Sequence, residues 1–147
     1  MEQETVKRTR NFSLRKIHVG DWVQVWMFGL RYTTPAKVTD ISDNGSIFYT
    51  LYEGQSVSCQ CKIENVDMIP ITEEILLGFG FDLREPHFNI SGKELKSVYW
   101  CGMYIGHLHK QNTSCILRVR GAGVSFVHEL QELFEYNNME IELKWKG

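Results

Sequence analysis

The sequence predicts an α+β fold in two consecutive parts. Residues 17–68 contain short segments with a two-residue hydrophobic period, which indicates β-strands. Residues 69–147 open with a capped helical segment, continue with further strands and return to a helical period. A chain of 147 residues fits one ordinary domain or two very small ones, and it can bury a core without disulfides or metal.

Four or five strands are expected in the first part, in the segments 18–28, 35–41, 47–52 and 56–64. Between the second and third strands, Asn44-Gly45 is a strong hairpin signal. One side of the first strand carries Val19, Val23, Val25 and Met27. One side of the last carries Val57, Cys59, Cys61 and Ile63. Short strands and tight turns over residues 17–68 predict a small, strongly bent SH3-like β-barrel.

The second part, residues 69–147, is expected to have the order α-β-β-β-α-β. Thr72 is a good N-cap for its first helix, and Gly78 or Gly80 ends that helix. Glycine loops that bind phosphate precede a helix, whereas those of "GFGF" follow one, so we interpret them as a helix end. The later elements are expected as three strands, a helix and a final strand, at residues 87–90, 97–109, 114–120, 121–138 and 139–145.

Charge and composition narrow the classes of function. A net charge of −2 argues against strong non-specific nucleic-acid binding, which scales with the number of phosphates neutralised. Residues 1–16 are basic, and we expect a solvated, flexible arm or, alternatively, a phosphate-contacting one. Because no apolar run reaches the roughly 20 residues of a membrane span and no signal peptide is evident, we expect a cytoplasmic protein with reduced cysteines.

Histidines and cysteines offer a weak metal hypothesis. His107 and His109 point the same way on a predicted strand, and Cys59 and Cys61 do so on another. A zinc site from these side chains and nearby thiols stays open as an alternative. The cysteines alternate in phase with Val57 and Ile63, however, so we interpret them as small core residues and expect no metal or cofactor. No nucleophile signature is present, and we expect no catalysis.

Aromatic residues are the more suggestive feature of the first part. Both sides of "DWVQVWMF" carry large apolar groups, although a small barrel has only one interior. Some rings must therefore be exposed, where they can stack on bases or hold a peptide, or else be buried between the two parts. The candidate binding residues are Trp22, Trp26, Phe28, Arg31, Tyr32, Tyr49 and Tyr52.

Three segments of the chain resemble a known group of sequences. They are "IHVGDWVQV", "MIPITEEILLGFGF" and "VHELQELFEYNNMEIEL". In these segments the chain resembles a family of small uncharacterised proteins from Bacteroidetes genomes and their phages, in which "PIPLTEEWLLKFGF" is typical. This chain departs from the pattern with Ile75 in place of a Trp and Gly78 in place of a Lys. The resemblance implies a phage or mobile-element source, and it implies no activity or site residues.

Together these observations predict a non-enzymatic binding protein that contacts a host or phage protein through an aromatic-rich surface. One alternative is a nucleic-acid-binding module that uses the basic arm with Trp26, Arg31 and Tyr32. Another is a small-ligand or zinc-binding protein that uses His107 and His109. No membrane partner is expected, and the sequence does not predict the oligomeric state.

Overall fold

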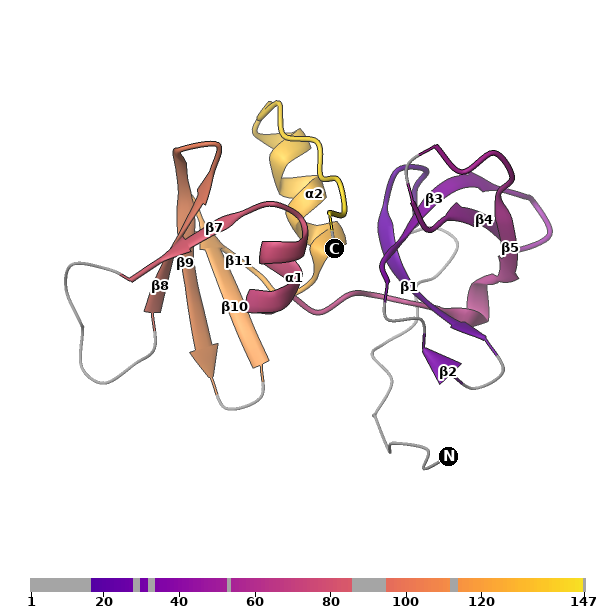
Figure 1. The fold of residues 1–147 in the computed structure, drawn as a ribbon, viewed down its shortest axis with the longest axis horizontal. Helices are drawn as coiled ribbons and strands as arrows, with labels where there is room; N and C mark the ends of the chain where they lie inside the picture. Colours follow the sequence, from indigo (N-terminus) through magenta and orange to yellow (C-terminus); the bar gives the residue numbers. More distant parts are fainter. Residues whose placement is uncertain are drawn as a thin grey trace. The chain divides into compact units, whose positions relative to one another are not determined.

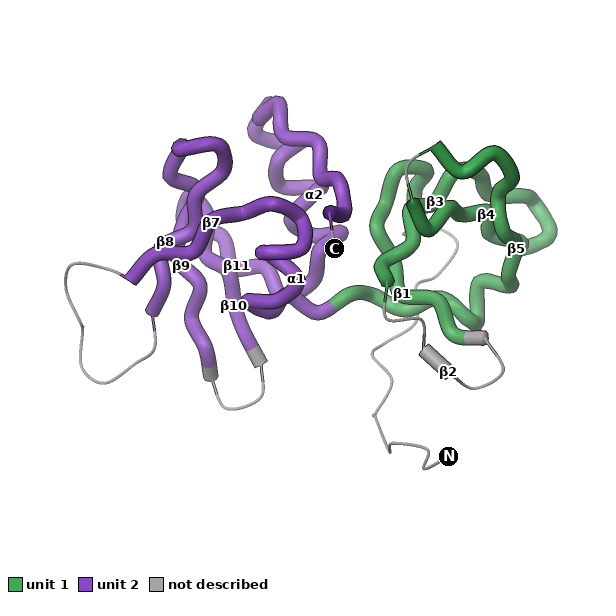
Figure 2. Tube along the Cα trace, viewed as in Figure 1, with its two compact units in different colours: residues 1–69 green, residues 70–147 purple. Residues whose placement is uncertain are grey.

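The computed structural model describes residues 17–27, 30–31, 34–52, 54–85, 95–111 and 114–146. For residues 27, 30, 31, 111 and 114 only the backbone is described. The chain divides into two compact units, residues 1–69 and residues 70–147 (Figure 2). Each unit contains an antiparallel sheet, and the described α-helices belong to the second unit (Figure 1). The predicted α+β class is therefore confirmed.

Unit 1 contains one sheet in which β1 pairs with several partners. The strands are β1 (Trp22–Met27), β2 (Leu30–Arg31), β3 (Ala36–Ile41), β4 (Ser46–Thr50), β5 (Cys59–Lys62) and β6 (Val66–Asp67). Their order is β2-β1-β3-β4-β5, and β6 also pairs with β1. A single 3-10 turn, Ile63–Asn65, connects β5 to β6. The strands predicted for the first part thus correspond to β1, β3, β4 and β5.

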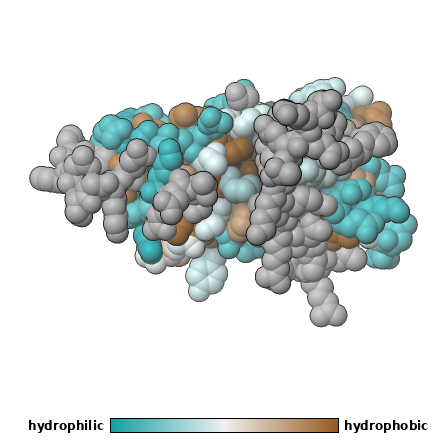
Figure 3. All heavy atoms as spheres, turned by 90° about the horizontal axis from the view of Figure 1, so that it is seen from below, coloured by the Kyte–Doolittle hydropathy of each residue, from teal (hydrophilic) through white to brown (hydrophobic). Residues whose placement is uncertain are grey.

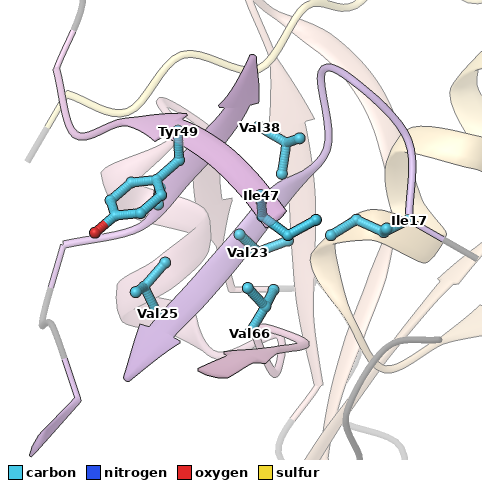
Figure 4. Packing of buried hydrophobic residues seen from close by; sticks show 8 residues of the cluster. Ile17, Val23, Val25, Val38, Ile47, Tyr49 and Val66 are labelled. Atoms are coloured by element: carbon cyan, nitrogen blue, oxygen red, sulfur yellow. The ribbon is translucent and has the colours of Figure 1, made fainter. Parts of the chain in front are cut away.

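The core of unit 1 lies between these strands (Figure 4). Its buried members come from four strands and the segment before β1: Ile17, Val23, Val25, Ala36, Val38, Ile47, Tyr49 and Val66. The predicted alternation is confirmed at Val23 and Val25. It is wrong at Val19 and Val57, which are 61% and 73% exposed, because both residues precede the strands in which they were placed.

Unit 2 is an antiparallel meander with helices at either end of its sequence. Its elements are α1 (Glu73–Gly78), β7 (Asp82–Arg84), β8 (Leu95–Trp100), β9 (Met103–Gln111), β10 (Ser114–Val119), β11 (Ala122–Val124) and α2 (Val127–Tyr136). The strand order β11-β10-β9-β8-β7 pairs each strand with its neighbours in sequence. Figure 1 shows both helices on the same side of this sheet.

Helix α1 begins and ends as its sequence predicts. The Thr72 hydroxyl accepts a hydrogen bond from the Ile75 N–H at 3.1 Å, which satisfies one free donor of the first turn. At the other end Gly80 has φ +94°, and the Phe81 N–H donates to the Leu76 carbonyl at 3.0 Å. This left-handed glycine closure confirms that "GFGF" ends a helix.

Three predicted elements of the second part are corrected. Residues 97–109 form two strands because Cys101 and Gly102 have φ of 48° and 81°, which reverses the chain in a tight hairpin turn. Arg120-Gly121 makes a similar turn, so residues 122–124 are a strand and not the start of a helix. Residues 139–145 form no strand, and the strand predicted at 87–90 lies outside the described residues.

The C-terminal segment packs against α1. The Trp145 ring meets the Phe79 ring edge-on, with 5.1 Å between centroids. The Lys146 N–H donates to the Gly78 carbonyl at 2.7 Å, which satisfies a free acceptor at the helix end. A Cβ at Gly78 would overlap Cζ3 and Cη2 of Trp145, so the indole occupies the space that a side chain would fill. Residues 143–146 are therefore an integral part of unit 2.

Candidate functional site

The sheet of unit 2 has two faces of different character. One face carries Val98, Leu108 and Leu117, which are almost completely buried. Lys96 lies beside Leu108 in register, and its Nζ is 2.9 Å from Oε1 of Glu73 in α1. This face therefore packs against the helices, as Figure 1 shows.

The strand register defines the opposite face. One row of side chains crosses four strands: Arg84, Ser97, His107 and Arg118. A second row crosses three strands: Asp82, Tyr99 and Tyr104. Neither α1 nor α2 covers these rows. We define the tyrosine face as Asp82, Arg84, Tyr99, Tyr104, His107 and Arg118.

Tyr104 lies at the centre of the contacts on the tyrosine face. Its hydroxyl is 2.6 Å from Nε2 of His107, a hydrogen bond in which either group can donate. Its ring meets the Tyr99 ring edge-on with 5.6 Å between centroids, and the His107 ring at 5.3 Å. Edge-on pairs of this kind are favourable because a positive ring edge meets a negative ring face. Tyr104 is still 47% exposed, so the cluster presents an ordered aromatic surface to solvent.

Arg84 extends the cluster along β7. Its guanidinium lies 4.3 Å from the centroid of the Tyr99 ring, a cation–π arrangement. Its Nε is also 3.0 Å from Oδ2 of Asp82. Both partners of this ion pair are more than half exposed, so the pair contributes little stability. Its main effect is to orient a cation on the surface beside the two tyrosines.

A β-bulge brings Tyr104 and His107 to the same face. Val98 pairs with Gly106, but the next residue of β8, Tyr99, pairs with Tyr104, so β9 carries one extra residue, Ile105. Side chains three positions apart on a regular strand point to opposite faces, whereas the bulge aligns Tyr104 with His107. At Gly106 the backbones of β9 and β10 approach so closely that a Cβ would overlap the Arg118 carbonyl oxygen. Glycine is therefore required beside the bulge.

The ionisation of Tyr104 favours a hydrogen-bonding role. Partial burial, with a smaller effect from Tyr99, raises the pKa of Tyr104 above its usual value of 10.0. The phenol therefore keeps its proton at neutral pH. A tyrosine that acts as a general base needs the opposite shift, so this environment is better suited to binding than to proton abstraction.

Charge is distributed unevenly between the two sides of unit 2. Glutamates are concentrated on the helices: Glu73 and Glu74 in α1, and Glu129, Glu132 and Glu135 in α2. The tyrosine face instead carries Arg84 and Arg118, with Asp82 as its one acidic member. The Arg118 side chain is exposed and reaches over Gly123 of β11, where a Cβ would lie 3.9 Å from its Nη1. Within the tyrosine face, the two arginines thus outnumber the one carboxylate.

The aromatic residues of unit 1 that were predicted as a binding site differ in their exposure to solvent. Trp22 is 6% exposed, and Lys37 Nζ lies 5.9 Å from its ring centroid. Tyr49 belongs to the core of the unit, where Figure 4 shows its ring among the aliphatic side chains. Tyr52 follows β4 and is 67% exposed. The structure therefore buries two of these predicted binding residues and exposes one.

The remaining predicted residues lie along β1 and the segment after it. Trp26 is half-buried on β1, and its backbone pairs with that of Arg31 in β2. Phe28 and Tyr32 lie outside the described residues, as does the side chain of Arg31. Strand pairing brings Trp26 and Arg31 next to each other, and a binding role for this group stays a prediction.

The histidines and cysteines are in separate environments. His107 contacts Tyr104, and His109 lies two residues further along β9. Cys59 and Cys61 pack half-buried against the core of unit 1, as expected for small core residues. Burial, with a smaller effect from Cys59, raises the pKa of Cys61 to about 11. Within the described part of the chain, no three His, Cys, Asp or Glu side chains are grouped to hold a metal ion.

Apolar surface gives a weaker indication of a site. On the face seen in Figure 3, hydrophobic residues form small separate areas among hydrophilic ones. Single exposed apolar side chains are normal on proteins and indicate no partner by themselves. In the segments that the structure describes, no helix is long and apolar enough to span a membrane. Tyr104 differs from these single side chains because its ring belongs to an ordered cluster.

Most residues of the tyrosine face were not predicted as a site from the sequence. Of its members only His107 was singled out, whereas Arg84, Tyr99 and Tyr104 were not. The available signal was the pair of tyrosines on either side of Cys101-Gly102, which a hairpin turn would align. Comparisons with protein-family models, curated proteins and solved structures found no match to this chain.

Proposed function

We propose that this chain is a non-enzymatic binding protein that holds a macromolecular partner on the tyrosine face of unit 2. The observation that carries the proposal is the ordered contact of Tyr104 with Tyr99 and His107 on a sheet face that neither helix covers. Tyrosine and arginine supply much contact area for little loss of side-chain freedom, and they are enriched where partners bind.

The support for a binding role lies in preorganisation. Arg84 is held by both Asp82 and Tyr99, and Tyr104 is held by both Tyr99 and His107. Side chains that are ordered before binding lose less conformational entropy when the partner arrives. The raised pKa of Tyr104 supports a neutral hydrogen-bonding group at the centre of the face.

We further propose that unit 1 is an SH3-like barrel that acts as a second module. Two features support this interpretation: the 3-10 turn before β6, and the return of β6 to β1. Exposed Tyr52 and Val57, between β4 and β5, offer this module a smaller contact surface. The resemblance to Bacteroidetes and phage proteins leads us to propose a bacterial cytoplasm as the setting and a host or phage macromolecule as the partner.

Site-specific photocrosslinking tests the proposed binding face. The photoreactive residue p-benzoylphenylalanine replaces Tyr104 in one variant and Tyr136 in the control. Tyr136 is an 86% exposed tyrosine of α2. Each purified variant is irradiated in a lysate of Bacteroidetes cells. We expect a discrete adduct from position 104 that position 136 does not give. The absence of an adduct at position 104, or the same adduct from both positions, would contradict the proposal.

A further inference from the structure

We propose that the partner of the tyrosine face is single-stranded nucleic acid, an inference that rests on the binding function proposed above. Two properties of the face lead to it: planar side chains that remain partly exposed, and cations that flank them. Proteins that hold single strands combine aromatic platforms, on which bases stack, with positive groups that follow the phosphates.

The planar groups are Tyr104, His107 and the guanidinium of Arg84. Tyr104 is the most suitable platform because 47% of its surface is exposed while its hydroxyl is fixed by His107. The Arg84 guanidinium lies over the Tyr99 ring, and its side chain is 55% exposed. Guanidinium planes, like tyrosine rings, can stack on unpaired bases. The face thus offers two platforms on neighbouring parts of the sheet.

The size of the face suits a short stretch of single strand. The row from Arg84 to Arg118 crosses four strands. At about 4.8 Å between strands, this row spans about 14 Å. That length corresponds to at most about four nucleotides, because four would fit only at the spacing of about 3.4 Å that fully stacked bases have. A duplex is a poor fit because its bases are stacked on one another and do not present their faces to side chains.

Charge favours nucleic acid over an ordinary protein partner. Arg84 and Arg118 stand at the two ends of the row, and Asp82 is already engaged by Arg84. Five glutamates of unit 2 lie on α1 and α2, whereas Glu85 directly follows β7 on the sheet.

Fluorescence anisotropy with labelled oligonucleotides tests the inference. The probes are oligothymidine and oligoadenine of about 16 nucleotides, and a duplex of the same length, over a salt series that starts at about 50 mM. We expect saturable binding of the single strands and weaker binding of the duplex. Tyr104→Leu should lower the affinity about tenfold without changing the salt dependence, because it removes stacking and no charge.

Arg118→Gln should change the salt dependence as well as the affinity. If Arg118 neutralises one phosphate, the slope of log K against log salt should fall by about 0.7. The matched controls are not members of the face: Tyr136→Leu is on α2 of the same unit, and Lys62→Gln is on β5 of unit 1. Both controls should bind as the wild type does. Tyr104→Phe keeps the ring and should retain the affinity within about twofold, which separates stacking from misfolding.

The outcomes distinguish this inference from the proposed function. If the wild type binds no single strand, or if Tyr136→Leu weakens binding as much as Tyr104→Leu, the nucleic-acid inference is wrong. A protein adduct at position 104 in the photocrosslinking experiment would then leave the binding function standing with a protein partner. If position 104 gives no adduct and no oligonucleotide binds, both the function and the inference are wrong.

Discussion

Replacing Gly78 by alanine should destabilise unit 2, although alanine is the better helix former. Gly78 is the last residue of α1, and its side-chain space is filled by the Trp145 indole. A new Cβ would overlap Cζ3 and Cη2 of that ring and would lie 3.0 Å from Cε3. Comfortable carbon contacts are about 3.5–4.0 Å, so the ring must shift by about 1 Å or more.

The cost of this shift should exceed the gain in helix propensity. Alanine gains at most about 1 kcal/mol over glycine in a helix, and less at its last residue. Overpacking a filled site costs about 1–3 kcal/mol. Loss of the edge-on contact between Trp145 and Phe79 adds about 1 kcal/mol. We therefore expect Gly78→Ala to lower the free energy of unfolding by about 2 kcal/mol.

A double-mutant cycle gives the decisive result. Once Trp145→Ala has removed the ring, Gly78→Ala should change sign and stabilise by up to about 1 kcal/mol. Unfolding in urea is followed by tryptophan fluorescence, with Trp22 and Trp26 of unit 1 replaced by phenylalanine. The signal then comes from unit 2 alone: from Trp100 in every variant, and also from Trp145 where it is present. A cost of about 2 kcal/mol moves the midpoint by about 1 M. If the cost of Gly78→Ala persists without Trp145, the packing explanation is wrong.

Three further predictions follow from single features of the structure. Cys101→Asn should stabilise unit 2 by about 0.5–1 kcal/mol, because asparagine tolerates the left-handed φ of 48° better than cysteine does. The control Cys101→Ala should give no gain in the same urea titration. Thr72→Ala should lower the free energy of unfolding by about 1 kcal/mol, because it removes the acceptor for the Ile75 N–H. Thr72→Ser keeps a hydroxyl at this position and should retain most of the stability. Equal stabilities for the alanine and serine variants would contradict the capping role. Burial, with a smaller effect from Cys59, raises the pKa of Cys61 from 9.0 to about 11. Between these two pH values the unfolded chain loses the thiol proton while the folded chain keeps it. The protonated thiol of Cys61 therefore stabilises the fold below pH 9.0, and this contribution is lost between pH 9.0 and about 11. At pH 8, iodoacetamide should therefore alkylate Cys61 about 100-fold more slowly in the folded protein than in urea, as measured by peptide mass spectrometry, and equal rates would refute this protected state.

Elements with a strong local signal were predicted well. The hairpin signal Asn44-Gly45 connects β3 to β4, with Gly45 at φ +87°, and the alternation of β1 places Val23 and Val25 in the core. Helix α1 starts after Thr72 as predicted, since the cap and the first-turn acids all act within a few residues of sequence. Interactions of this kind join residues that are close in the sequence, so they can be predicted without knowledge of the tertiary structure.

The failures occurred where the turn residues were unusual. Type I′ hairpin turns favour Asn-Gly, but Cys101-Gly102 and Arg120-Gly121 carry other residues in the first position. Because these first-position residues are uncommon in such turns, residues 97–109 were predicted as one continuous strand. Residues 139–145 alternate as a strand does, yet they form no strand. Trp145 packs against α1 instead, because Gly78 leaves room for its ring, and this is a contact between distant parts of the chain.

The tyrosine face could not be predicted from the sequence because the bulge in β9 changes which side chains share a face. A strict two-residue period places Tyr104 with Gly106 and Leu108, on the face opposite to His107. The extra residue Ile105 reverses this assignment for every position before it in the strand. Nothing local to the sequence marks the bulge apart from Gly106, whose close approach to the Arg118 backbone is visible only in three dimensions.

The meander order of unit 2 has a consequence for the sequence of folding events. Each strand pairs with a neighbour in sequence, and two of the hairpins turn on only two residues, so the sheet can form with little loop-closure entropy. Trp145 and Gly78, in contrast, must meet across almost the whole length of the unit. We therefore expect substitutions at the hairpin turns to change the folding rate, and Gly78→Ala to act mainly on the unfolding rate. The C-terminal residues would then be the last to dock, and their departure would be the first step by which unit 2 opens.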